Sequence, residues 1–166
     1  MRYNGLLLSL PKEVKYFLAT FIVVLSFGYF TGLLFVNQTE TTQPAGIEEN
    51  YLGNEEDVEA DVMKFKKGER EMLTIIHTHI LSMSFIFFLL GGIMLFTKLP
   101  TSFKMFLIIE PFFSILLTFG GIYFMWSGLI WMKYIVMISG VFMTVTFTTS
   151  VLIVLYQLLI KKNKIS

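Results

Sequence analysis

Four long apolar stretches constrain the fold of this chain more than any other feature. They run over residues 14–36, 72–97, 103–125 and 132–160, and each reaches the roughly 20 residues that a helix needs to cross a hydrocarbon core about 30 Å thick. A segment in lipid must satisfy its own backbone hydrogen bonds, and the runs lack the alternation of barrel strands. Only 15% of all residues are charged, against about 25% in soluble domains. The sequence therefore predicts an all-α, four-helix transmembrane bundle that forms a single integral membrane domain over residues 1–166.

Lysine and arginine residues predict the orientation of this bundle. Basic residues precede the first stretch, flank the turn after the second and close the chain: Arg2, Lys12, Lys15, Lys98, Lys104, Lys161, Lys162 and Lys164. Because basic residues collect on the cytoplasmic side, we expect both chain ends in the cytoplasm (N-in/C-in). The expected location is the bacterial inner (cytoplasmic) membrane, which the chain crosses several times.

Residues 37–71 would then form an acidic loop on the outer side, with ten acidic side chains between Glu40 and Glu71. Residues 38–46 are rich in Thr, Pro and Gly, which is typical of a linker. Residues 55–70 place apolar side chains among charges at a spacing compatible with a helix. The loop is too short to bury a core of its own, so we expect it to lie along the outer surface of the bundle.

His77 and His79 are the two histidines of the chain, and both lie inside the second apolar stretch. An ionisable pair at membrane depth is costly and indicates a functional site by default. Helical residues are about 100° apart, so the two rings project about 200° apart and cannot ligate one ion from a single face. Three interpretations follow: ligation of haem or a transition metal, proton or quinone chemistry, or hydrogen-bonded rings that only pack helices.

Methionines are the partners that a metal or haem site would use in a chain without cysteine. For haem b, Met125, Met132 and Met137 are expected at a matching depth, and His–Met ligation is a known arrangement. Ligation by two histidines would require a second copy of the chain. A copper(I) site would use His79, Met83 at i+4 and another Met, because thioethers suit that ion. Most of the ten methionines are expected to fill gaps in the core.

Glu110 is a carboxylate inside the third stretch, next to Pro111, which removes one backbone hydrogen bond and can kink a helix. One helical face, which we expect to line the bundle interior, carries Glu110, Ser114, Thr118, Gly121 and Met125. An interior carboxylate can relay protons or bind a cation. The alternative is a glutamate that reaches the cytoplasmic interface or caps a polar group. Its depth towards the cytoplasmic side indicates that it does not share a site with the histidines.

Gly28 and Gly32 form a GxxxG pattern in the first stretch. Small residues one turn apart let two helices approach closely. The pattern marks either packing inside the bundle or a face for association with a second copy.

A resemblance is carried by the segment that leads into the second stretch. It rests on Ile47 to Gly53 (IEENYLG), Met63-Lys64-Phe65, Glu71-Met72-Leu73 and His77-Thr78-His79 with Met83. Over residues 46–96 the chain resembles a family of uncharacterised bacterial four-span membrane proteins, in which an acidic loop leads into a His-x-His helix. The resemblance implies the four-span topology but no particular activity. The His-x-His pair is also similar to the haem-bearing helices of haem–copper-oxidase-like membrane proteins, which have more spans and further histidines.

Two classes of function follow from these patterns. The chain is either a small inner-membrane protein that binds haem or a metal through His77 or His79, as a redox-accessory subunit, or a non-catalytic structural or accessory subunit of a larger membrane complex. No nucleotide-binding, HExxH or serine-nucleophile motif is present, so the sequence favours no enzymatic activity. The net charge of +1 indicates no nucleic-acid partner. The expected partners are the lipid bilayer and either a second copy or a larger membrane complex.

Overall fold

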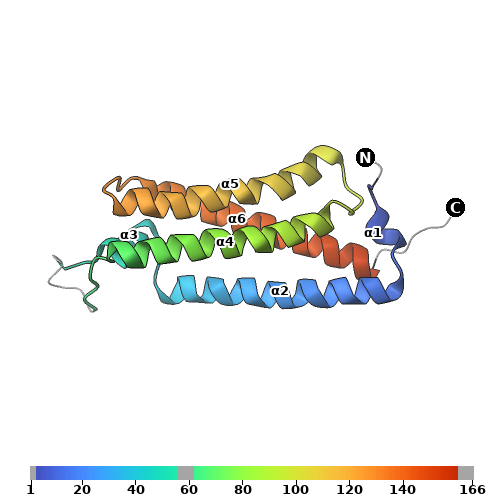
Figure 1. Ribbon diagram of the computed structural model, residues 1–166, viewed down its shortest axis with the longest axis horizontal. Helices are drawn as coiled ribbons and strands as arrows, with labels where there is room; N and C mark the ends of the chain where they lie inside the picture. The colour runs from blue at the N-terminus through green and yellow to red at the C-terminus, as the bar shows by residue number, and fades with distance from the viewer. Residues whose placement is uncertain (1–2, 56–61, 161–166) are drawn as a thin grey trace.

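The computed structural model describes residues 3–55 and 62–160, and these form helices, turns and loops without a strand (Figure 1). The elements are α1 (Leu6–Ser9), α2 (Lys12–Gln38), α3 (Pro44–Leu52), α4 (Glu69–Met94), α5 (Thr101–Trp126), α6 (Met132–Leu155) and the π-helix η1 (Tyr156–Ile160). Each predicted stretch falls on one long helix, and four helices are long and apolar enough to cross a membrane. The predicted all-α, four-helix architecture is confirmed. α5 continues as one helix through Pro111.

The two ends of the bundle carry different segments (Figure 1). At one end, α1 packs on the turn between α4 and α5, where the Leu7 amide donates to the Phe96 carbonyl over 2.9 Å. The Gln157 side chain of η1 reaches the same turn, and its Oε1 accepts from the Lys98 amide at 2.8 Å. The other end carries α3 and the turn between α5 and α6. The beginning of α2 and the end of η1 therefore lie at the same end of the bundle, as an even number of crossings requires.

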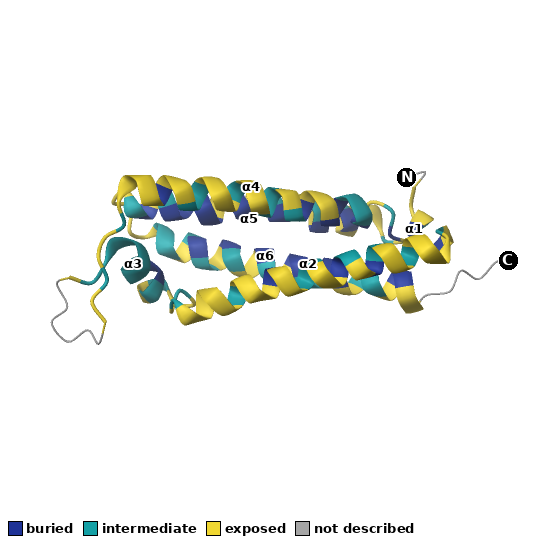
Figure 2. Cartoon of the chain, turned by 60° about the horizontal axis from the view of Figure 1, so that its bottom comes forward, coloured by how far each residue is buried: buried dark blue, intermediate teal, exposed yellow. Residues whose placement is uncertain are grey.

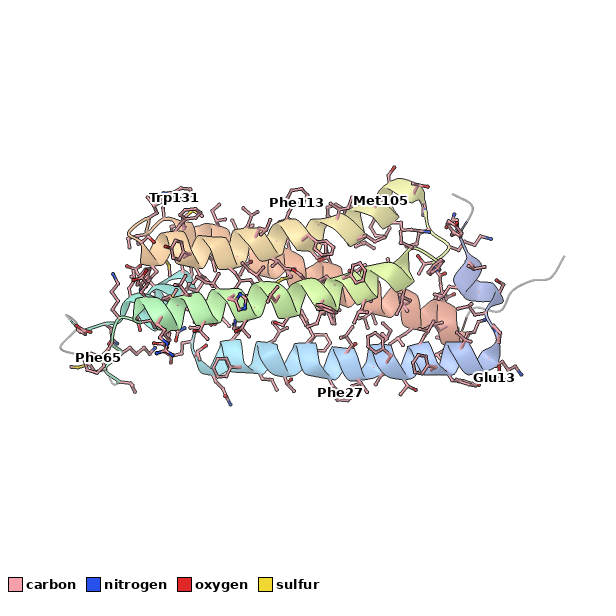
Figure 3. The ribbon with its side chains drawn as sticks, in the orientation of Figure 1. Glu13, Phe27, Phe65, Met105, Phe113 and Trp131 are labelled. Carbon is pink, nitrogen blue, oxygen red and sulfur yellow. The ribbon has the colours of Figure 1, made fainter. Side chains whose placement is uncertain are left out.

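The core of the bundle is built mainly by α5 and α6. The four spans differ in how much of their most apolar 18 residues is buried. The buried share is 44% in α5 and 39% in the span from α6 into η1, but only 17% in α2 and 11% in α4. Gly121 permits a close approach, because a Cβ added to it would lie 2.8 Å from Cγ2 of Val136. Figure 2 shows α2 and α4 exposed along most of their length. The outward side chains include Phe27 of α2 and Phe113 of α5 (Figure 3), as lipid contact requires.

α2 is held to the bundle by a group of three aromatic rings. Tyr29 stacks on Phe147 of α6, with ring centroids 3.8 Å apart and planes 11° apart. Phe87 of α4 meets both rings edge-on, at 6.3 Å and 5.8 Å. The Tyr29 ring thus joins three helices at one level.

The structure corrects the predicted organisation of the loop. The helix between the first two spans is α3, which begins at Pro44 inside the predicted linker, and the predicted helix over 55–70 is wrong for residues 62–68, which are not helical. Residues 56–61 lie outside the described residues. Proline at the first helical position starts α3, because its fixed φ suits a helix. Gly53 ends it with φ +82°, which favours glycine.

α3 and the segment that follows it cover the last turn of α5 and the first turn of α6. Lys133 of α6 forms an ion pair of 2.5 Å with Glu48 of α3. The Trp126 indole N–H donates to the Lys67 carbonyl over 2.8 Å. Asn54 precedes residues 56–61 in the chain and bonds the segment that follows them. Its Oδ1 accepts from the Lys64 amide at 2.6 Å. These contacts order the described part of the acidic loop against the bundle.

Candidate functional site

α4 carries both histidines well inside its length. The helix has 26 residues and is therefore about 39 Å long, and His77 and His79 lie about 12 and 15 Å from its start at Glu69. A hydrocarbon core of about 30 Å centred on this helix contains both rings. Both residues are nevertheless exposed on the surface of the chain. They are polar groups on the surface that a single copy turns towards the membrane.

The His79 ring has a fixed tautomer. Its Nδ1 lies 2.7 Å from the Ile75 carbonyl oxygen, and because that oxygen only accepts, Nδ1 carries the proton. A neutral ring then keeps its lone pair on Nε2, the atom that can accept a hydrogen bond or ligate a metal. The ring lies beside Phe119 of α5, with centroids 4.9 Å apart.

His77 lies on the opposite side of α4, as the helical angle predicts. It lines an open groove of about 640 Å³ together with Glu69, Arg70, Leu73 and Thr74, all residues of the same helix. None of the hydrogen bonds found among residues 3–55 and 62–160 involves its ring.

The predicted methionine partners lie on the inner side of the bundle. Met125 is fully buried, and Met83, Met132 and Met137 are partly buried against the core. The described part of the chain holds no group of three or more His, Cys, Asp or Glu side chains that could hold a metal ion. One copy therefore does not bring a complete ligand set of these types together at the histidines, and ligation by His77 or His79 stays a prediction.

Glu110 lies in a separate polar cluster inside the bundle. Ser114 Oγ donates to Glu110 Oε1, whereas Glu110 Oε2 is buried and has no hydrogen-bond partner within the described residues. The predicted interior face of α5 is confirmed, because Ser114, Thr118, Gly121 and Met125 are all buried. Thr118 Oγ1 also lies 2.7 Å from Ser139 Oγ of α6.

Two further polar residues, Tyr29 and Thr144, meet between α2 and α6 without a signal in the sequence. The Tyr29 hydroxyl of α2 lies 3.3 Å from Thr144 Oγ1 of α6, and Glu110 is close enough to that hydroxyl to act on it electrostatically. A tyrosine and a threonine in two apolar stretches carry no spacing signal that pairs them. Only the packing of the helices brings them together.

The GxxxG pattern does not serve packing within the chain. Gly28 and Gly32 are both exposed, and a Cβ added to either would meet no atom of residues 3–55 or 62–160 within 4 Å. Of the two interpretations, packing inside the bundle is therefore wrong, and association with a second copy stays a prediction.

The chain belongs to a family of transmembrane helical domains, whose family model matches residues 41–165. The match takes in α3 to η1 and leaves α1 and α2 outside it. No curated protein and no solved structure matches the chain. Together with the four apolar helices, the family membership defines a multi-pass membrane protein in contact with the lipid bilayer.

Proposed function

We propose that the chain is a non-catalytic membrane subunit that assembles with a second copy of itself through α4. The observation that supports this most is His77, an exposed imidazole about 12 Å along a helix of about 39 Å. A polar ring at that depth costs free energy unless it finds a hydrogen-bonding partner. Because the ring has no such partner in the described part of one copy, the assembled protein would supply it.

The surface that we assign to this contact is the α4 outer face. It is made of exposed residues within one side of the helix, namely Thr74, His77, Thr78, Leu81 and Phe85. α4 is the least buried of the four spans, so this face is not needed for packing within the chain. Hydroxyl and imidazole groups are the side chains that join transmembrane helices by hydrogen bonds.

A second copy fits this face by its chemistry. A hydroxyl and a neutral imidazole each donate and accept hydrogen bonds, so the same side chains on two copies can satisfy one another. Twofold symmetry places the same patch on both sides of an interface. We also propose that the chain serves as an accessory subunit in a bacterial inner membrane.

Single cysteines test the proposal cleanly, because the natural chain has none. Leu81→Cys lies on the α4 outer face, and Leu116→Cys on α5 is an equally exposed control at a similar depth (54% and 60%). In native membranes, a short thiol cross-linker should join Leu81→Cys into dimers and leave Leu116→Cys monomeric. Equal yields at the two positions, or no dimer at any of Thr74→Cys, Leu81→Cys and Phe85→Cys, would overturn it.

The second candidate function is a haem- or metal-binding redox-accessory subunit built on His79. The observation in its favour is the fixed tautomer, which leaves Nε2 with a lone pair. Met83 follows one turn later and would suit copper(I). The absorption spectrum of the purified protein would show a Soret band for haem, and elemental analysis would detect copper. Loss of the bound group in His79→Ala or His77→Ala supports ligation, whereas full retention in both variants ends this candidate.

A further inference from the structure

Glu110 lies inside the bundle, apart from the histidines of α4. It is the tenth residue of α5, about 14 Å from the start of that helix, and one of its carboxyl oxygens is buried without a hydrogen-bond partner among the residues described. Its one bonded neighbour is Ser114, which donates to the other oxygen from the next turn of the same helix. One of the two carboxyl oxygens therefore accepts no hydrogen bond from the described residues.

No cation balances this carboxyl group in the described part of the chain. The four ion pairs found there join Lys64, Lys67 and Lys133 to glutamates of the outer segment. Lys104 precedes Glu110 on α5, but its Nζ binds Asn4 Oδ1 and the carbonyls of Leu95 and Thr97. A carboxylate charge at this position would therefore be uncompensated.

The hydroxyl in contact with Glu110 belongs to Ser114 of the same helix. On the neighbouring helices, the Tyr29 hydroxyl of α2 contacts Thr144 of α6 at 3.3 Å, and Glu110 is among the groups that act on that hydroxyl electrostatically. A hydroxyl oxygen can accept a hydrogen bond as well as donate one. Among the described residues, the contacts of Glu110 therefore supply one hydroxyl, that of Ser114, and no cation.

From this buried oxygen without a partner or a cation we infer that Glu110 of α5 is an intramembrane proton-binding site. A buried carboxylate without a partner costs more than its neutral acid in an apolar medium. The ligand is a proton taken from water at the membrane surface: an O–H bond forms at Oε2, the negative charge is lost, and no electrons are transferred. Release of the proton restores the carboxylate. This site is independent of the proposed assembly through α4.

Dicyclohexylcarbodiimide tests the inference, because it reacts with protonated carboxyl groups in apolar surroundings. The acid O–H adds across one N=C bond of the reagent, and rearrangement leaves a stable N-acylurea of increased mass. We expect the full chain in lipid nanodiscs at neutral pH to form this adduct on Glu110, with a yield that falls at least severalfold as the pH is raised. Exposed Glu13 of α2 is the internal control and should stay unmodified.

Variants and competing ions make the test decisive. Glu110→Gln should lose the adduct, whereas Glu13→Gln should keep it. Protection by Na⁺ at constant pH would overturn the inference in favour of a cation site, and so would absence of the adduct in folded protein. If Glu110→Gln does not fold, infrared difference spectra of the unaltered chain replace it. A protonated-carboxyl band that disappears at high pH supports the proton site, and a band absent at every pH refutes it.

Discussion

The side-chain Nζ of Lys104 donates a hydrogen bond of 2.5 Å to the carbonyl oxygen of Thr97, just beyond the end of α4. The same Nζ donates to the Leu95 carbonyl at 3.1 Å and to Asn4 Oδ1 at 2.9 Å. Lys104 is only 1% exposed. One buried lysine of α5 therefore joins the end of α4 to the N-terminal segment.

Replacement of this lysine should weaken the end of the bundle that carries α1 and the turn between α4 and α5. Lys104→Met removes one donor from each of three oxygens. The Thr97 carbonyl keeps the Gly5 amide at 3.3 Å and Asn4 Oδ1 keeps the Leu99 amide at 3.2 Å, so the Leu95 carbonyl bears the main loss, which we expect to cost about 1–3 kcal/mol of unfolding free energy. Thermal unfolding in detergent, followed by tryptophan fluorescence, measures the loss. Lys98→Met, which changes an exposed lysine of the same turn, is the matched control and should change little. Equal losses in the two variants would contradict the role of Lys104.

The two adjacent glycines of α5 should respond very differently to one added methyl group. In Gly121→Ala the new Cβ would lie 2.8 Å from Cγ2 of Val136, so α5 and α6 must shift apart, whereas a Cβ at Gly120 meets nothing within 4 Å. We expect Gly121→Ala to cost about 1–3 kcal/mol and Gly120→Ala to be neutral or slightly stabilising. Thermal unfolding of both variants checks this, and a larger loss in Gly120→Ala would show that the close approach is misplaced.

Tyr29 should hold α2 through its ring more than through its hydroxyl. Tyr29→Phe removes the contact with Thr144 and should cost about 0.6 kcal/mol, the average for such bonds in membrane proteins. Tyr29→Ala also removes the ring stacked on Phe147 and should cost about 3–5 kcal/mol. Protease accessibility of α2 and thermal unfolding report the loss. Similar effects of both variants would assign the docking to the hydroxyl instead.

Tyr51 of α3 should make the outer segment sensitive to alkaline pH. Burial raises the pKa of this phenol above its ordinary value of 10.0, although a side-chain hydrogen bond with Asn50 opposes the shift. The folded state therefore holds this proton more tightly than the unfolded chain does. The resulting stability is complete below pH about 10 and declines as the pH rises through the folded-state pKa.

Comparison with Tyr51→Phe isolates this contribution from the other tyrosines. The unaltered chain should lose more thermal stability than Tyr51→Phe as the pH rises above about 10, because phenylalanine has no proton to lose. Melting temperatures of the two proteins at a series of pH values provide the measurement. Parallel profiles would show that Tyr51 does not titrate with the opening of this segment.

The outer segment shows where local patterns misled the prediction. Charged and apolar residues over 55–70 suggested a helix, but residues 62–68 pair with Asn54 and cover Trp126 instead. The helix forms earlier, from Pro44 to Leu52. Tertiary contacts, and not the local spacing of apolar residues, decided the conformation of residues 62–68.

Sequence alone determined the four membrane-spanning helices and the interior face of α5 that carries Ser114 and Thr118. Apolar runs of this length have few alternatives in lipid, because every backbone N–H and C=O must bond within its own helix, and helical geometry then sets which residues share a face. Tertiary structure alone decided which helices meet: Tyr29 stacked on Phe147, Lys104 at the end of α4, and Gly28 and Gly32 left without a neighbour among the described residues. Lipid is as apolar as a leucine side chain, so hydrophobicity does not choose partners among transmembrane helices. Shape and a few polar contacts, spread over segments far apart in the chain, make that choice.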